Sequence, residues 1–190
     1  MRVLIVDELS ERAEILREGL ERAGHEVAAM LSSAIDLLAA VDRFAPDIII
    51  VETASPSRDV LEHLVVLSRD KPRPIVMFAN DAQSKTIREA VRAGVTAYIV
   101  DGLDVDRVQP IVEVALARFE TFQTLRTELA HANLKLSERK LIERAKGLLM
   151  HARKLSEEEA YVRMRQLAMS RGKRLADIAQ QIIDASELLT

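Results

Sequence analysis

The feature that most constrains the fold of this chain is a regular alternation of apolar runs and helical patterns in its first hundred residues. Apolar runs stand at residues 3–6, 48–51, 75–78 and 97–100, separated by helical patterns such as 11–23 and 84–93. Parallel strands that are buried on both faces produce such runs, and the intervening helices form the crossovers. With a weaker strand near residues 26–30, we predict an α/β fold with a five-stranded, doubly wound parallel sheet. Functional groups are expected at the carboxyl ends of its strands.

Length and composition limit the classes of protein that this chain can belong to. Its 190 residues leave room for one domain of ordinary size and a small appendage. There is no cysteine, which excludes disulfides and thiolate metal sites, and the four histidines lack the paired spacings that bind zinc. Acidic residues at positions 7 and 8 interrupt any signal peptide, and no run of 18 apolar residues occurs. We therefore expect a soluble, cytoplasmic protein that makes no contact with membranes.

The net charge of −3 conceals an asymmetry between the two ends of the chain. Residues 1–130 contain 15 Lys and Arg against 22 Asp and Glu, whereas residues 131–190 contain 12 against 8. A basic module beside an acidic domain suggests a polyanionic partner for the module. Charge alone favours the simpler interpretation, a set of solvated helices.

The connection between the two regions is predicted to be one long helix. Between Pro110 and Gly147 the chain contains neither glycine nor proline, and helix-forming residues dominate. Apolar residues step by three and four positions, as in a coiled-coil seam: Phe122, Leu125, Leu129, Ala132 and Leu136. We expect this seam to mediate a homodimer, although it is short enough to pack on the chain's own domains instead.

The last part of the chain is predicted to be a small module of three helices. The first continues the connector to about Arg153, and Ser156 with Glu159 has the spacing of a capping box that opens the second. A turn near Gly172 ends the second helix, and the third runs over about residues 175–188. Basic residues are expected outside the apolar core of this bundle, including Arg139, Lys140, Arg144, Lys146, Arg171, Lys173 and Arg174.

Residues 1–120 resemble a response-regulator receiver domain. Asp7 and Glu8 match the acidic pair that holds a divalent ion, Ser55-Pro56 matches the loop after the third strand, and Tyr98 matches the aromatic residue of the fifth. The resemblance implies the fold of the chemotaxis protein CheY and of flavodoxin. Beyond this domain, we assign residues 110–136 to the coiled-coil connector and residues 137–190 to the C-terminal module.

Three central groups of the phosphorylation chemistry are replaced in this chain. By the same resemblance, Glu52 stands where the acceptor Asp belongs, Ala79 where a hydroxyl grips the phosphoryl group, and Asp101 where a Lys neutralises it. Phosphoryl transfer relies on positioned positive charge, so Asp in place of Lys reverses the required sign. We expect no phosphorylation. Glu52 either imitates the activated state in part or belongs to a relic pocket.

Four carboxylates converge in this pocket if the fold is as predicted: Asp7, Glu8, Glu52 and Asp101. Like charges at short range either recruit a cation or share protons. A weak Mg²⁺ site at Asp7, Glu8 and Glu52 and a partly protonated cluster are both consistent with the sequence. Neither makes an enzyme, and no other cofactor is expected.

The C-terminal module resembles the ANTAR family of RNA-binding antiterminators. The residues that match the family pattern are Ala145, Lys146, Gly147, Met150, Glu159, Ala160 and Tyr161. The resemblance implies binding to paired hairpins in leader mRNA, which prevents a terminator from forming and so affects RNA polymerase indirectly. Basic side chains would contact phosphates, and Tyr161 would stack on an unpaired base. From the residues alone, without this resemblance, Tyr161 would be interpreted as a core aromatic.

Residues 74–78, the loop from Ser55 to Asp59 and the uninterrupted connector resemble those of NasT-type regulators of nitrate and nitrite assimilation. This resemblance implies a nitrate- or nitrite-sensing protein partner instead of phosphorylation. Two other functions compete with RNA binding. A DNA-binding response regulator would need a recognition helix with a polar reading face, and none is evident. A protein-interaction adaptor would leave the basic residues merely solvated.

Overall fold

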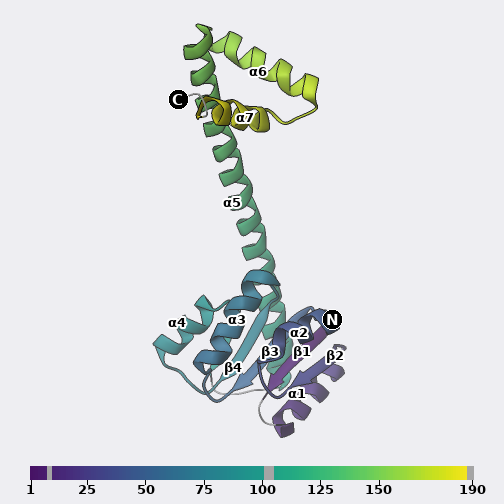
Figure 1. The fold of residues 1–190 in the computed structure, drawn as a ribbon. Coiled ribbons are helices and arrows are strands. Elements are labelled where there is room, and N and C mark those ends of the chain that lie inside the picture. The colour runs from purple at the N-terminus through teal and green to yellow at the C-terminus, as the bar shows by residue number, and fades with distance from the viewer. Residues whose placement is uncertain (8–9, 101–104, 188–190) are drawn as a thin grey trace. The chain divides into compact units, whose positions relative to one another are not determined.

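The computed structural model describes residues 1–7, 10–100 and 105–187 (Figure 1). The chain divides into two compact units, residues 1–123 and 124–190. Each unit has its own buried cluster of apolar side chains. Within the described ranges, no helix is both long enough and apolar enough to span a membrane.

The first unit is built on a five-stranded parallel sheet, which confirms the predicted fold class. Its strands are β1 (Arg2–Asp7), β2 (Glu26–Leu31), β3 (Ile48–Thr53), β4 (Ile75–Ala79) and β5 (Ala97–Val100), in the order β2-β1-β3-β4-β5. The pairing of β1 with β3 sets Asp7 opposite Glu52, at the carboxyl ends of both strands. The predicted functional edge of the sheet is therefore present.

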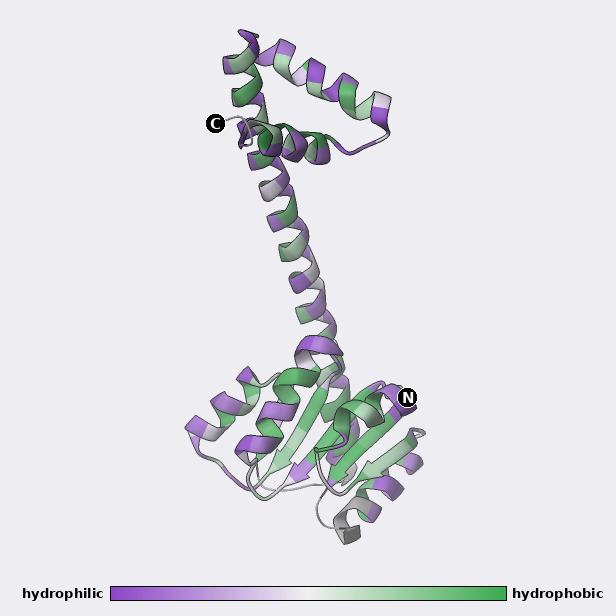
Figure 2. Cartoon of the chain, viewed as in Figure 1, coloured by the Kyte–Doolittle hydropathy of each residue, from purple (hydrophilic) through white to green (hydrophobic). Residues whose placement is uncertain are grey.

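Helices cover both faces of this sheet. The helices α2 (Leu37–Phe44), α3 (Arg58–Asp70) and α4 (Ser84–Arg92) contribute Leu37, Leu64 and Ala90 to one buried cluster. On the other face, α1 (Ser10–Arg22) contributes Leu16, and Val112 comes from the first part of the long helix α5 (Val105–Arg153). Apolar strands lie between helices with polar outer faces, as Figure 2 shows.

Glycine is required at the end of α4. Gly94 has φ +103, in the left-handed region that favours glycine, and a Cβ there would lie 1.8 Å from the Ser68 Oγ. The same Ser68 hydroxyl donates to the Ala93 carbonyl, 3.0 Å away, so α3 packs directly against this turn. The expected glycine cap therefore also permits a close approach between two helices.

The second unit contains the end of α5 together with α6 (Glu157–Arg171) and α7 (Leu175–Glu187). The capping box at α6 is confirmed: Glu159 N donates to Ser156 Oγ at 3.2 Å, and Ser156 N donates to Glu159 Oε2 at 2.8 Å. Gly172, with φ +60, ends the helix as expected. The buried cluster that joins the three helices consists of Ala145, Met164, Ala179 and Ile183.

Candidate nucleic-acid interface and the receiver-like pocket

The receiver-like pocket lies at the carboxyl ends of β1, β3 and β4. Asp7 and Glu52 are both 5% exposed and occupy facing positions on adjacent strands. Ala79 ends β4 and presents a buried methyl group where the resemblance calls for a hydroxyl. Glu8 and Asp101 lie outside the described residues. Within the described ranges, no three metal-binding side chains gather at one place.

Beside this pocket, a hydrogen-bond network is centred on Asp81. Its Oδ2 accepts from Ser55 Oγ at 3.0 Å and from Thr86 Oγ1 at 2.9 Å, and its Oδ1 accepts from the Gln83 backbone N–H at 2.8 Å. The Tyr98 hydroxyl donates to the Asp81 carbonyl at 2.8 Å. One residue thus links the loops after β3 and β4 with α4 and β5.

The ionised form of Asp81 suits this network. Hydrogen bonds from Gln83 N–H and then from the Thr86 and Ser55 hydroxyls lower the pKa of the Asp81 carboxyl. Burial, and then the nearby negative charge of Asp81, raise the pKa of Tyr98, which keeps its hydroxyl protonated as a donor. The network was not predicted, because no local spacing relates Ser55 to Asp81.

The predicted seam residues lie along α5 and are exposed. Phe122 and Leu129 are each 62% exposed, Leu125 is 58% and Leu136 is 52%, and Ala132 is also exposed. The four large side chains therefore form an uncovered apolar stripe on a single helix.

Lys146 departs from the prediction that the basic residues lie outside the core. It is only 8% exposed, and its Nζ lies 2.7 Å from Glu143 Oε2 and 2.7 Å from Glu157 Oε1. Glu143 is one turn away on α5, whereas Glu157 begins α6. The ammonium group therefore joins the end of α5 to the start of α6.

The electrostatics of this group of three residues favour its charged form. Hydrogen bonds to Glu143 and then Glu157 raise the pKa of Lys146, while the bond from Lys146 lowers the pKa of Glu157. The position of Glu143, three residues before the lysine, was a signal that the sequence offered. The contact with Glu157 depends on how two helices meet and had no such signal.

Two further cations predicted to bind RNA also form ion pairs within the module. Arg144 pairs with Glu187 at 2.8 Å, joining α5 to the end of α7. Arg174 pairs with Asp177 at 3.0 Å and with Glu138 at 3.2 Å, joining the start of α7 to α5. These pairs are largely exposed, so each contributes little to stability and can exchange partners readily.

Most of the remaining basic side chains of the module have no ion-pair or hydrogen-bond partner in the described chain. Of the twelve Lys and Arg in residues 131–187, three form the ion pairs above and Arg171 donates to the Gln181 amide at 3.3 Å. The side chains of the other eight make no hydrogen bond or ion pair within the described chain: Lys135, Arg139, Lys140, Arg153, Lys154, Arg163, Arg165 and Lys173. Of these, Lys173 lies near enough to Asp177 to help lower the pKa of that carboxyl. Over the same residues, Glu158 is the one acidic side chain without such a bond. The module's available charge is therefore strongly positive.

The residues of the family pattern divide between core and surface. Ala145 and Ala160 are fully buried, so they serve packing. Tyr161 is 42% exposed, which argues against a role as a core aromatic. Gly147 lies on the open side of α5, where a Cβ would meet nothing within 4 Å. Tyr161 and Gly147 are accordingly available to a ligand.

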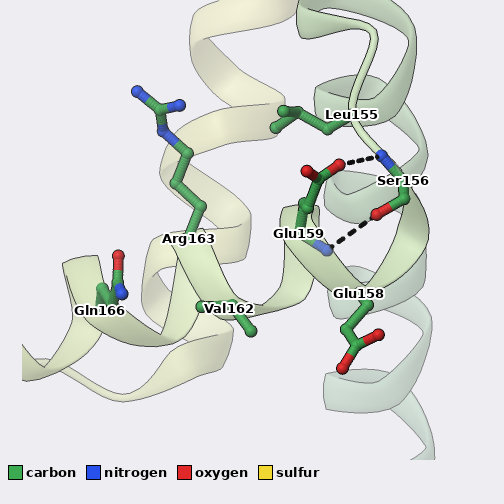
Figure 3. Close-up of a pocket in the computed structure, with 7 residues that line it drawn as sticks. All are labelled: Leu155, Ser156, Glu158, Glu159, Val162, Arg163 and Gln166. Carbon is green, nitrogen blue, oxygen red and sulfur yellow. Dashed lines mark hydrogen bonds between the residues drawn. The ribbon is translucent and has the colours of Figure 1, made fainter.

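An open groove runs along one side of α6 (Figure 3). Leu155 and Val162 provide apolar walls, and Gln166 contributes an amide. Figure 3 shows Arg163 and Glu158 projecting to opposite sides, with Glu159 and its bonds to Ser156 between them. Ser156 and Glu159 were predicted as a capping box, but no local pattern in the sequence indicates a groove beside them.

Comparison with known families explains both units. The response regulator receiver domain family matches residues 3–113, and the ANTAR domain family matches residues 130–183. The chain belongs to the response regulator receiver family and carries an ANTAR domain. Both families are regulatory domains, and no enzyme family is indicated.

Known relatives of this ANTAR response regulator support the assignment. The transcriptional regulatory protein PdtaR of Mycobacterium tuberculosis is 27% identical over 183 residues, covering 96% of this chain and 89% of PdtaR. The nitrate regulatory protein of Klebsiella oxytoca is 38% identical over 66 residues, covering 35% of this chain and 17% of that protein. The chain is thus similar to ANTAR response regulators of the NasT type.

Solved structures support the receiver fold of this response regulator. A signal receiver domain of a modulated diguanylate cyclase from Desulfovibrio desulfuricans aligns with a TM-score of 0.56 at 22% identity. The alignment covers 63% of this chain and 96% of that one. At this identity the likeness concerns the fold alone.

Proposed function

We propose that this response regulator binds paired hairpins in nascent leader RNA through its ANTAR domain and prevents a terminator from forming. The observation that carries the proposal is the eight cations without partners in a module whose acids are almost all engaged, within the described residues. Such a surface favours a polyanion, because each phosphate contact releases condensed counterions. The match to the ANTAR family over residues 130–183 favours RNA among the polyanions.

The predicted RNA-binding residues fall into two groups by their present contacts. Arg139, Lys140 and Lys173 are free to contact phosphates directly. The other four residues would first have to leave their present partners. Arg144 is paired with Glu187, and Lys146 with Glu143 and Glu157. Arg171 is bonded to Gln181, and Arg174 is paired with Asp177 and Glu138. We expect the free group to contribute more to affinity than the paired group.

We propose further that the active form is a homodimer that joins through α5. The seam from Phe122 to Leu136 is exposed in a single chain, and a second copy would cover it at coiled-coil spacing. Each buried Leu would contribute roughly 1.5–3 kcal/mol to association. Changing Leu125 and Leu129 to polar residues should shift the sedimentation coefficient to that of a monomer, and an unchanged coefficient would contradict the proposal.

Control by a protein partner accounts for the altered receiver pocket. Glu52 and Ala79 lack the acceptor and hydroxyl that the receiver chemistry uses, so a sensor protein would replace phosphorylation as the input. Similarity to the nitrate regulatory protein of Klebsiella oxytoca supports nitrate or nitrite assimilation genes as the target. A weak Mg²⁺ ion bound near Asp7 and Glu52 would have no catalytic role.

Acetyl phosphate with Mg²⁺ tests this mode of control. The full chain should acquire no phosphoryl group, and Glu52→Asp should acquire none either, because the hydroxyl is still missing at Ala79. Intact-mass spectrometry measures the adduct directly. A stoichiometric, base-labile adduct on the parent would show that phosphorylation controls this protein after all.

The RNA proposal is tested by electrophoretic shift with a two-hairpin RNA against duplex DNA of equal length. The full chain should retard the RNA at lower concentration. Arg139→Ala and Lys140→Ala should each weaken binding and reduce the salt slope by about 0.7–0.9. Arg88→Ala, which removes an exposed cation from α4 of the other unit, is the matched control and should change neither quantity.

The alternative functions predict other outcomes of the same measurement. Equal or tighter binding to duplex DNA would indicate a DNA-binding regulator. Absence of binding to both nucleic acids would leave a protein-interaction adaptor. Either result would refute RNA binding.

A further inference from the structure

The groove beside α6 combines two kinds of surface that are not paired with anything in the described chain. Val162 is 44% exposed although it is apolar, and it lines the groove together with Leu155. Gln166 is exposed, and its amide makes no hydrogen bond in the described chain. An apolar wall beside a free amide suits a flat group with a polar edge, because the wall contacts its face and the amide bonds its edge.

Charge decides which part of an RNA molecule can occupy this groove. Glu158 and Glu159 both line it, and hydrogen bonds from the Ser156 N–H and hydroxyl lower the pKa of Glu159, which keeps that carboxylate ionised. Two carboxylates at the groove would repel a phosphate group placed there. A neutral base suffers no such repulsion, and its N–H groups can donate to Glu158.

One cation lines the groove, and two others directly precede it in the chain. Arg163 lines one side and projects away from Glu158, as Figure 3 shows, and makes no ion pair in the described chain. Arg153 and Lys154 precede Leu155 directly and are also unpaired there. A phosphate next to an inserted base would therefore meet the positive charge of Arg163, while the base itself meets Leu155, Val162, the Gln166 amide and the Glu158 carboxylate.

We infer that this groove, lined by Leu155, Val162, Arg163 and Gln166, receives one unstacked base from an RNA loop. Val162 and Leu155 contact the face of the base, Gln166 and Glu158 bond its edges, and Arg163 neutralises an adjacent phosphate. Sequence-specific binding to RNA relies on such extruded bases. The inference rests on the proposed RNA-binding function and adds the place where a base is read.

A selection experiment supplies an RNA probe of defined sequence. The full chain is used to enrich a synthetic pool in which two stem-loops are joined by a linker and both loops are randomised. The enriched RNA should show a fixed base in at least one loop position. Replacing that nucleotide by an abasic one should then weaken binding to the parent by roughly 5- to 150-fold, the range expected for one stacked base.

Two groove variants link that base to its site. Val162→Phe fills the groove and Gln166→Ala removes the amide, and both positions are exposed, so the fold should be retained. Each variant should bind the intact RNA more weakly, and the abasic penalty should largely disappear because base and groove act as a coupled pair. The matched controls are Met169→Phe, at a 73% exposed site on the same helix, and Gln180→Ala on α7, which should retain the full penalty.

The outcomes separate this inference from the proposed function. If the parent enriches no RNA from the pool, RNA binding itself fails and the groove assignment with it. If the parent enriches RNA but both groove variants keep the full abasic penalty, the base is bound elsewhere. RNA binding would then stand, and the groove would be left to a peptide of a protein partner.

Discussion

The two units of this response regulator use charged side chains in different ways. In the receiver-like unit, Asp7 and Glu52 lie at the edge of a sheet whose core is complete on both faces. In the ANTAR module the buried cluster is small, and Lys146, Arg144 and Arg174 link α5 to α6 and α7 through ion pairs. These two carboxylates of the first unit lie beside its core, whereas these three cations of the second unit lie between helices.

The difference shows why the receiver-like unit can keep its fold when the residues at the ends of its strands differ. A sheet that is buried on both faces gains most of its stability from apolar contacts. The residues at the ends of its strands can therefore change without loss of the fold. A bundle of three short helices buries much less apolar surface, so polar contacts have a larger share in positioning its helices. Loss of phosphorylation residues is therefore compatible with an intact receiver fold.

The largest effect should come from the small core of the module. Met164→Ala removes a side chain that is 1% exposed and should cost about 2–5 kcal/mol. Such a loss is expected to unfold α6 and α7, because a module this small has little stability in reserve. Denaturant unfolding followed by circular dichroism measures it.

Met169 supplies the matched control on the same helix. It is 73% exposed, so Met169→Ala should change stability by no more than about 0.5 kcal/mol. Equal stability of the two alanine variants would refute the view that α6 is held by its inner face.

A second substitution examines the receiver-like unit. Gly94→Ala should destabilise that unit by more than about 1 kcal/mol, because its φ of +103 is strained for alanine and the new Cβ would meet Ser68. Gly24→Ala isolates the backbone strain, since Gly24 has φ +83 but nothing within 4 Å of a Cβ. Thermal melts of both variants should show the larger loss for Gly94→Ala, and the reverse order would contradict the close approach of α3.

A glycine in the ANTAR module should behave in the opposite way. Gly147→Ala is expected to stabilise α5 by about 0.5–1 kcal/mol, because the glycine lies inside a helix and a Cβ would meet nothing. If the same variant binds the two-hairpin RNA less tightly, the RNA occupies the open space beside Gly147. A loss of stability would mean that another group fills this space.

The smallest effect concerns pH and the Asp81 network. Because the pKa of Asp81 is lowered in the folded state, its stabilising contribution is present above the unfolded value of about 3.9 and is lost as pH falls through the folded pKa. The difference in melting temperature between the parent and Asp81→Asn should therefore shrink on acidification below about pH 4. A constant difference between pH 7 and pH 3 would contradict this role.

Tyr98 provides an independent spectroscopic check on the same network. In a Tyr161→Phe background it is the sole tyrosine, since the chain has two. Asp81→Asn removes a negative charge that helps to raise the pKa of Tyr98, so ultraviolet titration should show that pKa moving down. An unchanged titration would mean that burial alone sets it.

Much of the fold could be predicted from local patterns in the sequence. Continuous apolar runs identified the strands, and Ser156 with Glu159 identified the start of α6, because strand burial and helix capping depend on residues close together in the chain. The long helix was expected from Pro110 onward, and it begins earlier, at Val105. Proline is tolerated in the first turns of a helix, so Pro110 indicated that the helix begins nearby but did not identify its first residue.

The candidate site was less predictable, because it depends on which side chains meet. Sequence alone established that the module is basic and that the phosphorylation residues are replaced. Only the tertiary structure decided that Lys146 is buried between Glu143 and Glu157, that Tyr161 is exposed, and that Asp81 holds several loops. Charge and helical periodicity are properties of neighbouring residues, whereas ion pairs between helices and grooves beside them arise from packing across long separations in the chain.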